Sequence, residues 1–186
     1  KTHSVTITLS DPSSGTITRE YWAGVQGDRV SDIPLNKPPT STSSLNIFEG
    51  PSNIGTNYGT RIRGYVTAPV SGFYVFNIAS NDHSELWLST GEDPSQKTLI
   101  ASVTGATGIR EWNKYASQRS DPVMLTAGER YYIESLHKQG VGTDNIAVAW
   151  TVGGLVERPI PASRLSPYET TAETMTSAPD GNSQFE

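Results

Sequence analysis

The chain has 186 residues and a formal net charge of −5 at pH 7. This length fits one domain, and the acidic balance leaves no clustered basic charge for coating nucleic acid. The absence of cysteine excludes disulfide bonds, zinc–thiolate centres and a thiol nucleophile. Roughly a quarter of the residues are Ser or Thr, as in many exported β-proteins, and no apolar run approaches the ~20 residues of a membrane-spanning helix. Because the chain begins Lys-Thr-His, we expect a segment of a longer, exported protein.

Apolar and polar residues alternate with a period of two along most of the chain, which predicts strands. Residues 73–79 are a clear example, since Tyr74, Phe76 and Ile78 would form one face. The predicted strands, in chain order, are Ser4–Leu9, Thr16–Trp22, Thr60–Ala68, Phe73–Ala79, Glu85–Leu88, Thr98–Val103, Val123–Thr126, Arg130–Leu136 and Asn145–Val152.

The connecting segments are rich in residues that break regular structure. Residues 28–35 predict one short helical turn that Pro34 ends. Residues 36–44 predict a loop, because they hold two prolines and a run of hydroxyl side chains. Residues 104–111 predict a glycine-rich connection, and residues 170–186 a linker or tail.

Short strands with turn signals about every ten residues, and no amphipathic helix between them, predict an all-β fold. The expected architecture is an antiparallel β-sandwich with long loops and one or two short helical turns. We expect an N-terminal strand or extension over residues 1–15, one domain over 16–168 and a C-terminal linker or tail over 169–186.

Five segments in a fixed order carry a resemblance to a known family. They are the stretch from Gly64 to Ser89, which contains Gly-Phe-Tyr-Val-Phe-Asn-Ile-Ala-Ser-Asn-Asp, and the residues 19–22, 127–134, 144–150 and 158–161. In this order they resemble the PA14 domain of bacterial glycosidases, adhesins, flocculins and a toxin component. The resemblance covers about residues 16–168 and implies a PA14-type β-sandwich.

The resemblance directs attention to the pair Asn81-Asp82. In sugar-binding members, two adjacent acidic residues joined by a cis peptide bind Ca²⁺ here, and the metal then takes two sugar hydroxyls. The present chain departs from that pattern, because its first acid is Asn81. An amide oxygen still suits a hard cation but brings no charge. Without the resemblance, Asn81-Asp82 also fits an ordinary polar turn.

The loop over residues 138–145 is the second half of the expected calcium site. The resemblance implies that a loop in this place completes the metal shell, and Asp144 and Asn145 are the candidate side-chain ligands. Glycines at 140 and 142 allow the backbone to turn its carbonyl groups inward. Gly-x-Gly followed by Asp-Asn is also what an ordinary hairpin loop uses.

Aromatic and polar residues near these loops are candidates for direct sugar contact. Trp112 lies in a polar, loop-like stretch and is the candidate stacking platform, the alternative being a plug for one end of the sandwich. His83, His137, Lys138 and Gln139 are the candidate hydroxyl partners.

The other tryptophans are expected to serve packing. Trp150 is predicted to lie in the core and Trp87 to be half-exposed, because each follows the alternation of its own strand. Trp22 is expected in the core as well, because the resemblance implies it for a strand that matches the family's early motif.

The sequence offers no pattern typical of an enzyme. Asp82-His83-Ser84 contains the residue types of a hydrolase triad, but adjacent residues of an extended chain point to opposite faces. Neither Gly-x-Ser-x-Gly nor His-Glu-x-x-His occurs. No catalytic residue is therefore predicted.

The function expected from the resemblance is a secreted, non-catalytic, lectin-like module that binds glycan hydroxyls through Ca²⁺. Its partners would be polysaccharides or cell-surface sugars in an adhesive or enzyme-accessory role, with no nucleic acid and no membrane insertion. The alternative is an assembly or protein-interaction module that contacts neighbouring domains or subunits of a larger extracellular protein. Either reading places the chain outside the cell or at the cell surface.

Overall fold

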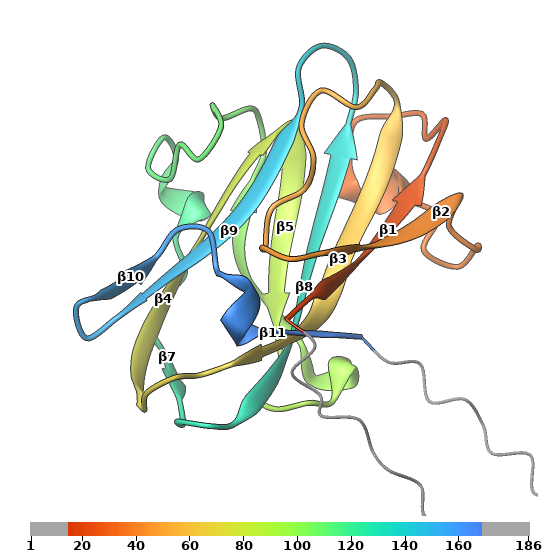
Figure 1. Ribbon diagram of the computed structural model, residues 1–186. Helices are drawn as coiled ribbons and strands as arrows, with labels where there is room; N and C mark the ends of the chain where they lie inside the picture. The colour runs from red at the N-terminus through yellow and green to blue at the C-terminus, as the bar shows by residue number, and fades with distance from the viewer. Residues whose placement is uncertain (1–14, 169–186) are drawn as a thin grey trace, which may run out of the picture.

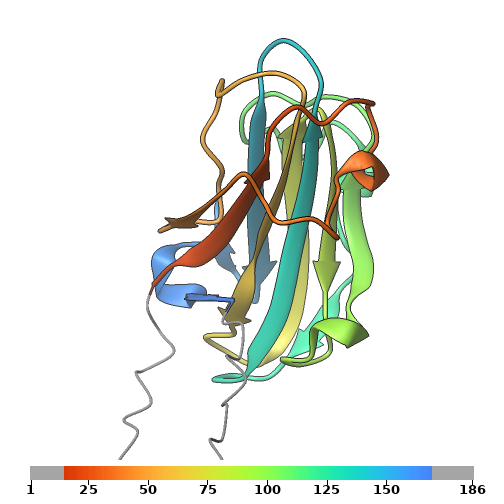
Figure 2. The same cartoon turned by 90° about the vertical axis from the view of Figure 1, so that its right-hand side faces the viewer.

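The computed structural model describes residues 15–168, which form two stacked antiparallel sheets (Figures 1 and 2). This confirms the predicted all-β sandwich. The strands of the described part are β1 (Ile17–Trp22), β2 (Ser41–Leu45), β3 (Tyr58–Thr67), β4 (Gly72–Asn81), β5 (His83–Leu88), β6 (Thr98–Val103), β7 (Val123–Leu125), β8 (Arg130–Gln139), β9 (Asn145–Val152), β10 (Leu155–Glu157) and β11 (Leu165–Pro167).

The two sheets differ in size. Among the described residues, one sheet has seven strands in the order β2-β1-β3-β8-β5-β6, with β11 paired to β3. The other has four strands in the order β10-β9-β4-β7. Consecutive strands β4 and β5 belong to different sheets, and so do β8 and β9. Both of these crossings lie at the same end of the sandwich, because Asn81 stands opposite Asn145 and His83 opposite Lys138.

The core lies between the sheets and follows the alternation of the sequence. On β4, the side chains of Tyr74, Phe76 and Ile78 are fully buried, and Trp150 of β9 packs against the first two of them. Burial of such large apolar side chains supplies the main stabilisation of a sandwich. The prediction that Trp150 is a core residue is confirmed, and Trp87 is partly exposed as expected. Trp22 is buried as predicted, but in a second apolar cluster outside the space between the sheets.

A second, smaller apolar cluster covers part of the outer face of the seven-stranded sheet. The segment around the 3-10 turn η1 (Val30–Asp32) lies on this face, with Val30 and Ile33 packed on Trp22 and Leu136. The turn falls inside the predicted helical turn. The other helical segments of the described part are also three-residue 3-10 turns: η2 (Pro94–Gln96), η3 (Ala116–Gln118) and η4 (Ala162–Arg164). No helix within residues 15–168 is long and apolar enough to span a membrane.

Several predicted boundaries need correction or lie outside the described residues. The loop predicted for residues 36–44 is wrong at its end, because Ser41–Leu45 forms the edge strand β2 against β1. Its hydroxyl side chains are mostly exposed, so this strand is held by its backbone pairing with β1 and not by burial of its side chains. The predicted strand Ser4–Leu9 and the predicted tail over 170–186 lie outside the described residues.

A charged network lies on the outer face of the seven-stranded sheet. Glu20 of β1 is 7 % exposed and accepts hydrogen bonds from Arg61 Nε (2.5 Å) and Arg63 Nη2 (2.8 Å), both on β3. Burial alone would raise the pKa of Glu20, but the hydrogen bonds and charges of the two arginines lower it overall. The ion pairs therefore stabilise the fold when Glu20 is ionised.

We expect Glu20→Gln to lower the free energy of unfolding by about 2–3 kcal/mol, because two largely buried guanidinium groups lose their carboxylate. Denaturant unfolding at pH 7 measures this. The matched control is Glu92→Gln, since Glu92 pairs with Arg130 at 3.4 Å and its side chain is 58 % exposed. The control should change stability by less than ~0.5 kcal/mol.

The effect of Glu20→Gln should also depend on pH. A carboxyl group whose pKa is lowered by folding contributes its full stabilisation above its unfolded pKa, for which the ordinary glutamate value is 4.5. That contribution is lost as the pH falls through the lower, folded value. The difference between wild type and variant should therefore shrink in acid, and a constant difference down to pH 2 would contradict this account.

Candidate functional site

The two crossings between the sheets bring Asn81-Asp82 next to the loop that precedes Asn145. Asn81 ends β4 and stands opposite Asn145 in the ladder with β9, while His83 begins β5 and stands opposite Lys138 of β8. The β4–β5 and β8–β9 connections are therefore neighbours by strand pairing. The peptide bond between Asn81 and Asp82 is cis, as the resemblance implied for this position.

Hydrogen bonds tie the two connections together. The Asp82 carboxylate accepts from the Gly140 amide (2.9 Å), and the Asp82 amide donates to Gln139 Oε1 (3.1 Å). The Asn81 side-chain amide donates to Thr143 Oγ1 (3.0 Å). These bonds fix the direction in which the remaining oxygen atoms of Asn81 and Asp82 point.

A cleft of about 410 Å³ lies on the outer side of this junction, which we call the junction cleft. Asn81, Asp144 and Asn145 line it, whereas Asp82 lies beside it and faces the loop at Gly140. The other lining residues are Asn53, Ala106, Thr107, Gly108, Ile109, Lys114 and Thr143. Three of the four predicted metal ligands thus share one cleft.

Asn145 carries an unusual oxygen atom. Its Nδ2 donates to the backbone carbonyl of Thr107 (3.1 Å), while its Oδ1 is buried without a hydrogen-bond partner. Leaving a buried acceptor unpaired costs about 1–3 kcal/mol. An oxygen of this kind has unused capacity for a cation or a donor that enters the cleft.

Asp144 already has a structural task. Its side chain is buried, and its two oxygens accept from the amides of Asn53 (2.6 Å), Ile54 (2.9 Å) and Gly55 (3.4 Å). The Tyr58 hydroxyl also donates to it, and burial together with this carboxylate raises the pKa of Tyr58. Asp144 therefore holds the segment 53–55 against the cleft.

The donor set can be compared with what Ca²⁺ requires. The available atoms are all oxygens, from the side chains of Asn81, Asp82 and Asn145, which suits a hard cation. Asp82 contributes a carboxylate that accepts from one backbone amide, whereas the Asp144 carboxylate already accepts from three. Within residues 15–168, no three or more His, Cys, Asp or Glu side chains gather in a way that could hold a metal. The oxygen ligands are therefore of the type that Ca²⁺ prefers, but they carry little negative charge to retain the ion.

Three of the candidate hydroxyl partners are corrected by the structure. His137, Lys138 and Gln139 are at most 1 % exposed, so they cannot reach a glycan in solution. The alternation that predicted β8 stops at Leu136, but β8 continues to Gln139. These residues are covered because the core lies on one side of β8 and the η1 segment on the other.

Their polar groups instead support the junction. His137 Nε2 donates to the Asn81 carbonyl (2.8 Å), and burial lowers the pKa of His137 to about 4. The ring is therefore neutral at pH 7. Lys138 Nζ donates to the Gln139 carbonyl (2.7 Å), and burial lowers its pKa.

The remaining candidates lie away from the junction cleft. His83 is half-buried and lines a separate cavity with Arg29 and Glu85. Trp112 is half-buried and lines a larger cleft on the other side of the loop that contains Ala106 and Tyr115. Sequence patterns could not separate these places, because the course of this loop depends on contacts distant in sequence.

The chain matches the family model described as the PA14 domain over residues 12–162, and it belongs to this family. A mouse N-acetyl-beta-glucosaminyl-glycoprotein 4-beta-N-acetylgalactosaminyltransferase 1 is 40 % identical over 119 residues, which are 61 % of this chain and 11 % of that protein. Dog fibrocystin is 32 % identical over 92 residues, 45 % of this chain and 2 % of that protein. The chain thus spans a small part of these relatives.

Solved structures share the fold. A PA14 sugar-binding domain from an RTX adhesin superposes with a TM-score of 0.62 at 14 % identity, covering 82 % of this chain and 98 % of that domain. The A domain of Epithelial Adhesin 6 from Candida glabrata, in complex with Galb1-3GlcNAc, gives 0.57 at 11 % identity, covering 84 % and 88 %. At such identities the likeness establishes the sandwich and its topology.

We expect Asp144→Asn to release the segment 53–55, because an amide has one acceptor oxygen in place of two. The stability should fall by about 1–3 kcal/mol, and the amides of Ile54 and Gly55 should exchange hydrogen faster. Asp121→Asn is the matched control, since Asp121 is exposed and the same charge is lost. Unchanged exchange at residues 54 and 55 in Asp144→Asn would refute this role.

Proposed function

We propose that the domain is a non-catalytic, extracellular glycan-binding module whose binding site is the junction cleft and whose ligand is held with the help of Ca²⁺. The observation that carries the proposal is the pairing of Asn81-Asp82 with Asn145, whose buried Oδ1 has no partner. Membership of the PA14 family and the glycan complexes of similar folds support the choice of ligand.

Asn81 and Asn145 would hold the ion from inside the junction cleft, and the Asp82 carboxylate oxygen that is not bonded to the Gly140 amide would reach it from beside the cleft. Bound Ca²⁺ supplies a hard centre that accepts sugar hydroxyl oxygens in exchange for water. The protein holds the amide groups in place through Thr143 and Thr107, so little side-chain ordering is needed on binding. With few carboxylates, we expect weak retention of the metal.

The rim of the cleft supplies contacts that suit a sugar. Ile109 is 62 % exposed and offers an apolar surface to the C–H face of a ring. Lys114 and Thr143 also line the cleft and can bond hydroxyl groups. Lys114 Nζ already donates to the Ala106 carbonyl (2.6 Å), which places it at the edge.

The chemistry of the cleft favours binding over hydrolysis. Glycoside hydrolysis uses two carboxyl groups on either side of the scissile bond. Asp144 is the acidic residue among those lining the junction cleft, and its oxygens are committed to backbone amides. This supports a module that positions or attaches a glycan, in an adhesin or beside an enzyme domain.

The metal requirement is tested by calorimetry with CaCl₂ and with Galβ1-3GlcNAc, in the presence of calcium and then of chelator. We expect Asn81→Asp to tighten calcium binding by roughly tenfold, since it adds a carboxylate, and Asn145→Ala to weaken it. Asn36→Asp, at an exposed position outside the junction cleft, is the charge-matched control.

The outcomes separate the parts of the proposal. If glycan binding is unchanged in the presence of chelator, the calcium requirement is refuted and the glycan-binding function is retained. An array on which no glycan binds with or without calcium, although the protein is folded, would exclude the glycan-binding function.

A further inference from the structure

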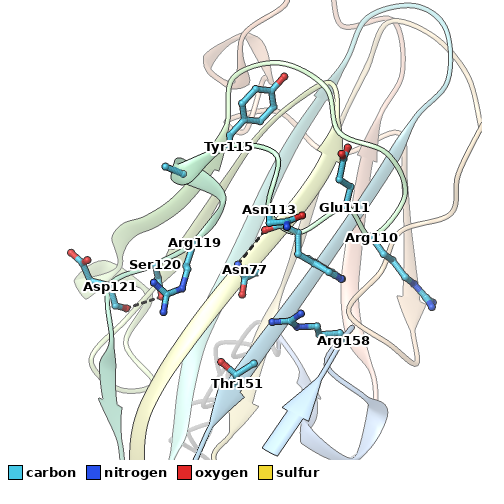
Figure 3. A pocket seen from close by; sticks show the side chains of 12 residues that line it. Asn77, Arg110, Glu111, Asn113, Tyr115, Arg119, Ser120, Asp121, Thr151 and Arg158 are labelled. Atoms are coloured by element: carbon cyan, nitrogen blue, oxygen red, sulfur yellow. Dashed lines mark hydrogen bonds between the residues drawn. The ribbon is translucent and has the colours of Figure 1, made fainter. Parts of the chain in front are cut away.

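A second and larger cleft lies on the outer face of the four-stranded sheet, on the other side of the loop from the junction cleft. Its volume is about 930 Å³. Asn77 of β4 and Thr151 of β9 form the floor, and residues 110–121 together with Arg158 form the walls (Figure 3). We call it the arginine cleft.

Side-chain hydrogen bonds hold the wall of the cleft in place. Gln118 is fully buried, and its Nε2 donates to the carbonyls of Ile78 (2.9 Å) and Glu111 (2.6 Å). Asn77 Nδ2 donates to the Trp112 carbonyl (3.4 Å), so floor and wall are joined. The cleft is therefore formed before any ligand arrives.

Two guanidinium groups in the cleft have no partner. Among residues 15–168, the side chains of Arg119 and Arg158 make no hydrogen bond or ion pair, whereas Arg110 pairs with Glu49 at 2.6 Å. Figure 3 shows Arg119 and Arg158 on either side of Asn77. Two like charges that share a cleft favour an anionic group between them.

The nearby carboxylates do not neutralise this pair. Glu111 accepts a hydrogen bond from the Gly108 amide (2.7 Å), and it lies at the far end of the cleft in Figure 3. Asp121 lies at the edge nearest Arg119, and its carboxylate makes no ion pair with a described residue. Its negative charge should oppose an anionic ligand.

We propose that the arginine cleft is a binding site for an acidic saccharide, with Arg119 and Arg158 on a sugar carboxylate. The planar guanidinium group matches a carboxylate through two parallel hydrogen bonds. Asn77 and Thr151 offer donors and acceptors to sugar hydroxyls, and the half-buried Trp112 offers an aromatic surface to a ring. This combination fits a sugar acid better than a bare inorganic anion.

The inference shares with the proposed function only the chemical class of ligand. The site, its residues and its source of affinity are different, since charge pairing replaces metal coordination. Binding in the arginine cleft should therefore resist chelation and fall with increasing salt, which distinguishes failure of one proposal from failure of the other.

The test is titration of the ¹⁵N-labelled domain with trigalacturonate in excess chelator, with the trigalacturonate methyl ester as the uncharged comparison. We expect trigalacturonate to shift the Trp112 indole signal and the amides of residues 77, 119 and 151, leaving those of 81 and 145 unchanged. Arg119→Gln and Arg158→Gln should each weaken binding by roughly tenfold, and Asp121→Asn should strengthen it by a few-fold.

Lys37→Gln is the charge-matched control, because Lys37 is exposed and lies outside the cleft. Equal binding of trigalacturonate and its methyl ester would overturn the proposal. So would unchanged affinity in both arginine variants, with thermal unfolding showing that they are folded. Shifts confined to residues 81 and 145 would assign the acidic sugar to the junction cleft instead.

Discussion

Both clefts depend on the register in which β4 and β9 pair. Seven residue pairs run from Val75 opposite Thr151 to Asn81 opposite Asn145. This register turns Phe76 and Ile78 inward against the core and leaves Asn77 and Asn81 on the opposite, outer face. A slip by one residue would place amides in the core and aromatic rings in solvent, so the buried face fixes the position of the polar one.

The loop over residues 104–121 then divides that outer face. Thr107 contacts the backbone at Ser80 through its amide (2.7 Å) and its hydroxyl (3.1 Å), and Gln118 is anchored at Ile78. Between these two anchors the chain stands away from the sheet, with the junction cleft on one side and the arginine cleft on the other. One sheet face thus offers a recess lined by the amide side chains of Asn81 and Asn145 beside a cleft that holds two arginines unpaired among the described residues.

The alternation of residues predicted the core of this domain well, because a strand with one buried face has apolar residues at every second position. Tyr74, Phe76 and Trp150 were predicted to face inward and are fully buried. The predicted approach of residue 81 to residue 145 came from the resemblance alone. Local patterns carry no information about which strands pair across the sandwich.

The positions of several candidates share one physical cause. Trp112, His137 and Lys138 lie where contacts between distant segments decide burial and direction. His137 bonds the Asn81 carbonyl, 56 residues away, and the position of Trp112 depends on a bond from Asn77. The edge strand β2 was missed for a related reason, since exposed hydroxyl residues show no burial pattern until β1 pairs with them.

The two ends of the described body meet at one edge. β11 pairs with β3, beside β1, and the Tyr168 amide donates to Thr18 Oγ1 (3.3 Å), so entry and exit lie close together below the sheets (Figure 1). A domain whose two ends lie close together can be inserted into a surface loop of another protein without disturbing the fold of that protein. The inserted domain would be joined to that protein at both ends on one side, and both clefts would lie at a distance from it.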